Sequence, residues 1–105
     1  MTLEPDVNDL YLQLCKALGT IGEFTEETKK TSIHLVRKSA FAGVHPRKKY
    51  LIITVKAGRA LDSPRIFKSE QLSKNRWHHE VKLTSPSEID AELIGWLSES
   101  YELSA

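Results

Sequence analysis

The run Tyr50-Leu-Ile-Ile-Thr-Val-Lys56 constrains the fold more than any other segment of the sequence. Its length and its β-branched side chains favour an extended strand over a short buried helix. Apolar residues on both faces are typical of a strand that is covered on both sides. We therefore expect a central strand whose second face needs a cover. A second copy of the chain, a curled sheet or the loop at residues 19–31 could supply it.

The segments around this run also predict β structure. Alternation of apolar and polar residues, or a short apolar run, predicts further strands at Ser32–Lys38, Ala40–Val44, Arg65–Lys68 and Trp77–Thr84. In the last of these, Trp77 and His79 share the face that we expect to point inward. His45–Lys49 predicts a turn, because Pro46 cannot donate a hydrogen bond to a sheet.

One helix is predicted near each end of the chain. Apolar residues recur at helical spacing over residues 6–18, with Pro5 at the start and Gly19 after the last apolar position. Ser85-Pro86-Ser87-Glu88 has the pattern of a capping box, so we expect the second helix to begin at Ser85 and to cover residues 86–101. The residues between the first helix and the first strand, 19–31, predict a loop anchored by Phe24.

The order of these elements predicts the fold class. Helix, strands and helix follow one another without the β-α-β alternation of a parallel sheet. We therefore expect an α+β fold, in which an antiparallel sheet of four to five strands carries an N-terminal and a C-terminal helix. A chain of 105 residues fits one domain, residues 1–105.

The charges are strongly segregated along the chain. Residues 29–82 carry 14 Lys and Arg against three acids, a net charge of +11, whereas residues 1–28 and residues 83–105 each carry −5. Acidic helices beside a basic sheet, all of them solvated, explain this pattern without any function. A basic surface for an anionic partner is the alternative explanation.

Several classes of function find no support in the sequence. No apolar run is long enough to span a membrane, and acids stand where a secretion signal needs bases. The one cysteine, Cys15, lies on the apolar stripe of the first helix and fits a reducing compartment. We therefore expect a cytoplasmic protein without membrane contact.

Catalysis and metal binding also lack their usual patterns. There is no nucleophile elbow and no paired-carboxylate motif, so an enzyme is less expected than a binding domain. His78 and His79 are adjacent on a predicted strand and point to opposite faces, while His34 and His45 lie on other elements. We expect no metal and no cofactor.

Basic residues of the middle segment are the best candidates for a binding site. Arginine and lysine suit phosphate or carboxylate groups, and histidines add hydrogen-bond donors. The candidate residues are Arg37, Lys38, His45, Arg47, Lys48, Lys49, Arg65, Lys68, Arg76 and His78. If the first three strands form consecutive hairpins, residues 37–38 and residues 47–49 fall at opposite ends of the sheet and make a stripe.

Three hypotheses of function follow. The first is weak, salt-sensitive binding of nucleic acid or another polyanion through the basic sheet. The second is a homodimer or protein-interaction module, in which the acidic helices of one copy meet the basic sheet of another. The third is a small-molecule binder or enzyme with a pocket lined by His79, Arg65 and Trp77.

From Lys29 onward the chain resembles a bacterial domain family of unknown function. The resemblance covers about three-quarters of the chain and is carried by KKTSIHL, AFAGVHPRKKYLIITV, LDSPRI, KSEQLSKNRWHHEVKLTS and IDAELIGWLSESYEL. It implies a domain that occurs alone, beside another small uncharacterised domain, or at the end of proteins with nuclease-like domains. Some members are labelled predicted transport proteins. The resemblance supplies no catalytic residues, and its link to nuclease-like domains favours the nucleic-acid hypothesis by analogy.

Overall fold

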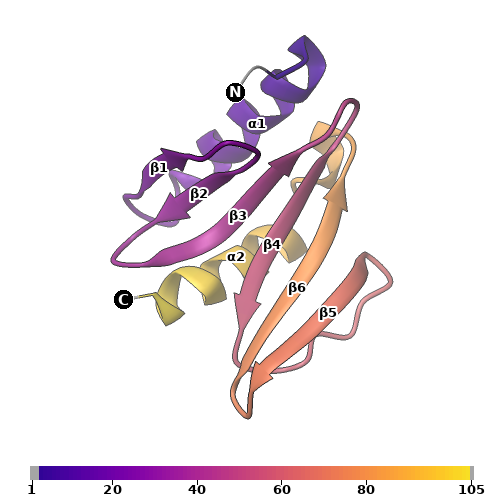
Figure 1. The fold of residues 1–105 in the computed structure, drawn as a ribbon. Helices are drawn as coiled ribbons and strands as arrows, with labels where there is room; N and C mark the ends of the chain where they lie inside the picture. Colours follow the sequence, from indigo (N-terminus) through magenta and orange to yellow (C-terminus); the bar gives the residue numbers. More distant parts are fainter. Residues whose placement is uncertain (1–2, 105) are drawn as a thin grey trace.

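The computed structural model describes residues 3–104, which form two helices and six strands in the order helix, strands, helix (Figure 1). The elements are α1 (Pro5–Leu18), β1 (Thr25–Thr28), β2 (Ile33–Val36), β3 (Ala40–Pro46), β4 (Leu51–Ala57), β5 (Ile66–Ser73), β6 (Arg76–Leu83), a 3-10 turn (Pro86–Glu88) and α2 (Ala91–Leu103). No helix in this range is long and apolar enough to cross a membrane.

The six strands form one antiparallel sheet in the order β1-β2-β3-β4-β6-β5. From β1 to β4 each strand follows its neighbour through a hairpin. After β4 the chain skips one position in the sheet and forms β5 at the far edge. It then returns as β6, which fills the position between β4 and β5. The predicted α+β class is therefore confirmed, with one or two more strands than expected.

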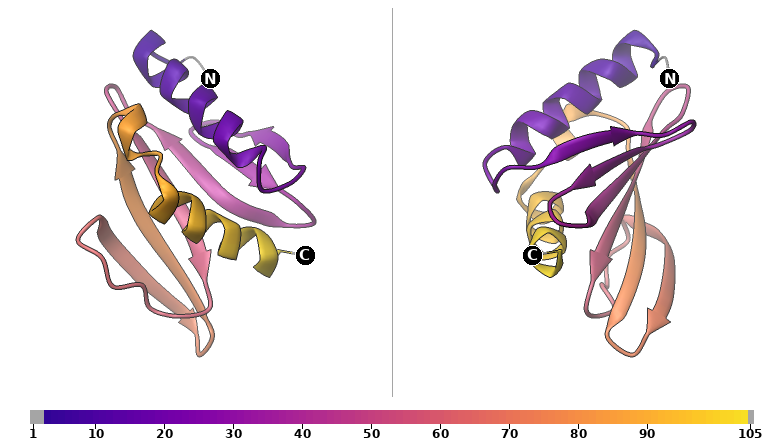
Figure 2. Two further views of the ribbon diagram at one scale, coloured as in Figure 1. Left: turned by 180° about the vertical axis from the view of Figure 1, so that it is seen from behind. Right: turned by 60° about the vertical axis from the view of Figure 1, so that its left-hand side comes forward.

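Both helices lie on the same face of this sheet, as the two views of Figure 2 show. Alternation sorts the strand residues between the two faces, since successive side chains of a strand point in opposite directions. In β4, Leu51, Ile53, Val55 and Ala57 are buried beneath the helices, whereas Ile52, Thr54 and Lys56 are partly exposed on the opposite face. The predicted packing of both helices on one sheet is thus confirmed.

The core lies between the helices and this inner face. Leu14 and Leu18 of α1 and Leu93 and Leu97 of α2 have at most 1 % of their surface exposed. Phe41 adds an aromatic contact, because its ring meets Tyr101 edge-on with ring centres 5.2 Å apart.

The second helix begins later than the sequence predicts. Ser85-Pro86-Ser87-Glu88 forms a separate 3-10 turn, in which the Glu88 carboxylate accepts hydrogen bonds from the backbone N–H groups of Thr84 and Ser85. Asp90 is the N-cap of α2, because its carboxylate accepts from the Leu93 N–H at 3.1 Å. The predicted start at Ser85 is wrong because Asp90, five residues further on, supplies a second cap.

Three other boundaries differ from the prediction. The segment 19–31 is not all loop, because Thr25–Thr28 pairs with β2 as an exposed edge strand. β5 runs to Ser73, longer than expected, since pairing with β6 holds residues that carry no apolar pattern. His45 and Pro46 end β3 and do not lie in the turn; Pro46 stands opposite Leu51 at the last paired position.

Gly22 lies in tight contact with the Tyr101 side chain of α2. A methyl group at Gly22 would lie 2.8 Å from Cζ of Tyr101, whose hydroxyl donates to the Glu23 carbonyl at 2.7 Å. We expect Gly22→Ala to lower the free energy of unfolding by about 1–3 kcal/mol through overpacking.

Gly95→Ala is the matched control. It adds the same methyl group to exposed helix, where no atom lies within 4 Å, and should stabilise the protein by about 0.5–1 kcal/mol. Urea unfolding measures both variants, and effects of the same sign would contradict the predicted contact.

Candidate functional site

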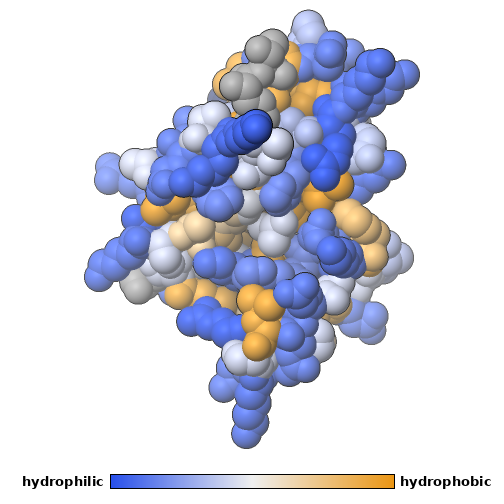
Figure 3. Space-filling model, in the orientation of Figure 1, coloured by the Kyte–Doolittle hydropathy of each residue, from blue (hydrophilic) through white to orange (hydrophobic). Residues whose placement is uncertain are grey.

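The sheet face opposite the helices is the candidate site, and we call it the open face. It is the side seen in Figure 1, and Figure 3 shows it as a mostly hydrophilic surface with small apolar patches. Alternation and register place on it His34, Gly43, His45, Ile52, Thr54, Lys56, Lys68, Glu70, Arg76, His78, Glu80 and Lys82. Among the residues described, neither helix covers this face.

Register aligns the polar residues of the open face in cross-strand rows. One row runs from His34 through Gly43 and Thr54 to Glu80. In a neighbouring row, Lys56 stands opposite His78, and Glu70 stands opposite His78 on its other side. Residues in such rows are direct neighbours, so the open face brings side chains from four strands together.

A hollow of about 140 Å³ lies over the middle of this face. Gly43 contributes no side chain there, and the small residues Ala40 and Ala42 also line it. The larger lining residues are three histidines, a threonine and a lysine: His34, His45, His78, Thr54 and Lys56. The site is therefore rich in imidazole rings and holds one ammonium group.

A second hollow of about 250 Å³ shares two lining residues with the first, Lys56 and His78. Its other lining residues are Ser39, Leu72, Ser73, Arg76, Trp77, Leu103 and Ser104. The two hollows therefore adjoin, with Lys56 and His78 where they meet.

Burial sets the protonation of the histidines at this site. The pKa of His45 is lowered mainly by desolvation, with a further contribution from the positive charge of Arg47. Desolvation also lowers the pKa of His78, and the nearby Lys56 lowers it further, against an opposing effect of Glu70. Both rings are therefore neutral at neutral pH and can donate and accept hydrogen bonds.

A further prediction follows from these two rings. The folded protein binds fewer protons than the unfolded chain once the pH falls below the ordinary histidine pKa of 6.5. The contribution of these rings to stability is therefore present above that pH and is lost as the pH falls through their folded-state pKa values. NMR titration of the ring protons should give midpoints below 6.5 for His45 and His78; midpoints at or above that value would contradict the burial argument.

Lys56 and Arg76 form a pair of like charges beside the hollows. The pKa of Lys56 is lowered by desolvation first and by the charge of Arg76 second. Within residues 3–104, neither side chain has a carboxylate within 4.0 Å, whereas Lys68 pairs with Glu80 at 3.5 Å. Two neighbouring cations without a carboxylate at ion-pair distance favour the binding of an anion.

The structure brings part of the predicted stripe together. His45, Lys68, Arg76 and His78 share the open face. Arg47, Lys48 and Lys49 lie in the β3–β4 turn, where Arg47 and Lys48 line a depression with Lys30 of the β1–β2 turn. Arg37 and Lys38 lie in the β2–β3 turn, at the other end of β3.

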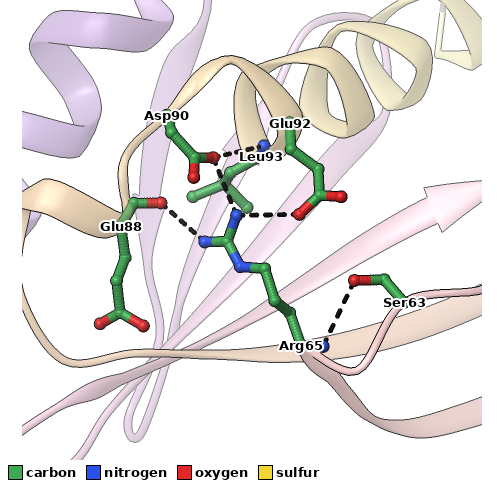
Figure 4. A network of polar contacts seen from close by, with 6 residues as sticks. All are labelled: Ser63, Arg65, Glu88, Asp90, Glu92 and Leu93. Carbon is green, nitrogen blue, oxygen red and sulfur yellow. Dashed lines mark hydrogen bonds and ion pairs between the residues drawn. The ribbon is translucent and has the colours of Figure 1, made fainter.

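Two of the predicted arginines are engaged in holding α2. Arg65 donates to Asp90 at 2.8 Å, to Glu92 at 3.2 Å and to the Glu88 carbonyl at 2.7 Å, as Figure 4 shows. Arg37 donates to the Tyr101 carbonyl at 3.1 Å and lies over the Tyr101 ring. These contacts attach both arginines to the helix layer.

His79 cannot line a ligand pocket. It has no exposed surface, its Nδ1 lies 2.7 Å from Ser69 Oγ, and its Nε2 lies 3.1 Å from the Arg59 carbonyl. Its ring stacks on Trp77 with ring centres 5.7 Å apart. The predicted inward face of β6 is confirmed. The predicted pocket of His79, Arg65 and Trp77 is wrong because the His79 ring is enclosed.

Sequence reasoning missed Lys56 and Gly43 as site residues. Lys56 closes the strongest predicted strand and shares its outward face with Thr54, a signal that the alternation already contained. Gly43 carried no signal by itself, because its meaning depends on the register that places it beside His34 and Thr54. Within residues 3–104, no three His, Cys, Asp or Glu side chains are placed to hold a metal ion.

The fold and the site define a small α+β domain whose antiparallel sheet is covered by helices on one face and carries a histidine- and lysine-lined hollow on the other. The model of the family described as Domain of unknown function (DUF5655) matches residues 2–104, so the chain belongs to that family. No curated protein and no solved structure matches the chain.

Proposed function

We propose that this domain binds nucleic acid through its open face. The observation that carries the proposal is that two cations, Lys56 and Arg76, line the same hollow. Among the described residues, neither has a carboxylate within 4.0 Å. An anion placed there compensates two charges that repel one another. A repeating phosphate backbone extends the same attraction to the other bases of the face.

Further cations along the sheet support a long anionic partner over a single small anion. Lys82 stands opposite Ile52, four residues before Lys56 in β4, and adds another cation to the open face; its ammonium group lies over the Tyr50 ring. The basic turn of Arg47, Lys48 and Lys49 joins the end of β3 to the start of β4, at the opposite end of β4 from Lys56. The resemblance to a family found beside nuclease-like domains agrees with this partner by analogy.

A titration of labelled DNA and RNA, followed by fluorescence anisotropy, tests the proposal. At about 50 mM salt, the wild-type protein should bind, and the double variant Lys56→Ala/Arg76→Ala should bind about tenfold or more weakly, since each phosphate contact contributes to affinity. Lys16→Ala is the matched control, because Lys16 lies on α1 in the helix layer. Arg47→Ala and Lys48→Ala should weaken binding alike for all base sequences, since phosphate contacts carry no sequence information.

Two experimental results would contradict the proposal. One is the absence of binding to every single- and double-stranded probe at low salt. The other is an equal loss of affinity per charge removed in Lys16→Ala, which removes one charge, and in the double variant, which removes two, since that would place the attraction in the overall charge and not on the open face. Either result would leave the dimer or interaction module as the better hypothesis.

A further inference from the structure

Gly43 occupies a position in β3 where the backbone does not require glycine. Its φ is not positive, and it is paired on both sides, with His34 and Thr54. Glycine inside a strand weakens the strand and often marks a place where a ligand approaches the backbone closely. Here the missing side chain opens the space into which the neighbouring histidines face.

The walls of this hollow suit a flat ring. A side-chain carbon at Gly43 would lie 3.3 Å from Nε2 of His45 and 3.5 Å from Cβ of Thr54, so the His45 ring sits directly beside the open position. His34, His78 and Thr54 are the other larger lining residues, and the small residues Ala40 and Ala42 leave space between them. Histidine rings stack on nucleobases, and their nitrogens hydrogen-bond to base edges.

The two cations lie where a phosphate attached to such a ring would be. Lys56 lines the hollow over Gly43 and also the adjoining hollow that Arg76 lines. Ser39 and Ser73 also line the adjoining hollow. A ring-binding hollow next to a pair of uncompensated cations matches the two parts of a nucleotide.

We propose that the ligand of the open face is single-stranded nucleic acid, with one base in the hollow over Gly43 and its phosphate at Lys56 and Arg76. This inference rests on the proposed function and makes it narrower. A duplex keeps its bases stacked inside the helix, so it can reach the cations but cannot fill the hollow without the cost of unstacking a base. A single strand presents its bases freely.

Three labelled probes of equal length separate the contribution of the base from that of the phosphates. They are an oligothymidylate, the same strand annealed to oligoadenylate, and an abasic strand with the same phosphates. The wild-type protein should bind the oligothymidylate about tenfold more tightly than the abasic strand, the size expected for one stacked base. It should also prefer the single strand to the duplex. Lys56→Ala/Arg76→Ala should weaken binding of all three probes.

Gly43→Val fills the hollow and should remove the preference for the strand with bases over the abasic strand. Gly43→Ala is the second variant, since its methyl group needs only a small shift of the His45 ring and should preserve the fold. Gly58→Ala is the matched control, because its methyl group would make only an ordinary contact with the Asn75 carbonyl at 3.6 Å. Thermal unfolding confirms that each variant is folded.

The outcomes separate the two proposals. Equal affinity for all three probes, or a base preference that both Gly43 variants retain, would overturn the inference and leave nucleic-acid binding standing. Failure of the wild-type protein to bind any probe would overturn the proposed function and the inference with it.

Discussion

Leu93→Ala is expected to lower the free energy of unfolding by about 2–5 kcal/mol, the range for emptying a buried leucine site. Leu93 has no exposed surface and packs from the first turn of α2 into the core beneath the sheet. The cost contains the lost transfer of the side chain from water and the cavity that remains after partial relaxation. Urea unfolding followed by circular dichroism measures it.

Leu14 and Leu12 of α1 provide a matched pair for the same experiment. Leu14 has no exposed surface, whereas 56 % of the Leu12 surface is exposed. Leu14→Ala should cost about 2–5 kcal/mol, and Leu12→Ala should change the stability by less than about 0.5 kcal/mol. Similar losses at both positions would contradict the orientation of α1 on the sheet.

The fold was predictable where residue patterns are strong and local. The apolar stripe of α1 and the alternation of Trp77, His79, Val81 and Leu83 each define one buried face. Both patterns predict packing on a common sheet, and the structure confirms it. Such patterns arise because one face of the element is buried, so they can be recognised without knowing which other elements pack against it.

The edge strands were not predictable in the same way. β1 consists of Thr25-Glu-Glu-Thr28, and all four residues are exposed. In β5 every residue after Ile66 is exposed. An edge strand without a buried face has no apolar alternation, and only pairing with its neighbour defines it. The late start of α2 has a related cause, since two capping sequences stand close together and packing selects the second.

The candidate site was predictable in its chemistry but only partly in its position. The segregated charge of residues 29–82 pointed to the sheet, and His45, Arg76 and His78 do lie on the open face. Arg37 and Arg65 instead contact α2, because their side chains reach carbonyl and carboxylate groups at its two ends. No sequence pattern separates an arginine that holds a helix from one that faces solvent.

The outward face of β4 exposes less apolar surface than the sequence suggested, so it has less need of a second copy of the chain or a loop to cover it. Tyr50-Leu-Ile-Ile-Thr-Val-Lys56 is apolar by composition, yet the outward positions within β4 are Ile52, Thr54 and Lys56, of which only Ile52 is fully apolar, and Lys82 lies over the ring of Tyr50 just before the strand. Lys82 stands opposite Ile52 and Glu80 stands opposite Thr54, so polar neighbours surround the single isoleucine. Dimerisation stays a prediction, which light scattering at high protein concentration tests.

Binding of nucleic acid by the open face is expected to weaken steeply with salt. Each phosphate that the protein neutralises releases condensed counterions, so the logarithm of the binding constant falls by about 0.9 per phosphate contact for each unit of the logarithm of salt concentration on duplex DNA, and by about 0.7 on a single strand. With roughly three to five contacts, affinity should fall about ten- to a few hundredfold between 50 and 200 mM salt.

The competing explanation is that the acidic helices cancel the field of the sheet, since the whole chain carries a net charge of only +1. The helices lie on the far side of the sheet, and screening limits the reach of their charges to about 10 Å at 0.1 M salt. The field near the open face is therefore set mainly by the charges of that face, four cations (Lys56, Lys68, Arg76 and Lys82) against two carboxylates (Glu70 and Glu80). Anisotropy titrations at several salt concentrations measure the slope, and Lys56→Ala/Arg76→Ala should reduce it by roughly two contacts. A slope near zero, or one that the double variant leaves unchanged, would mean that these lysine and arginine side chains do not meet phosphate.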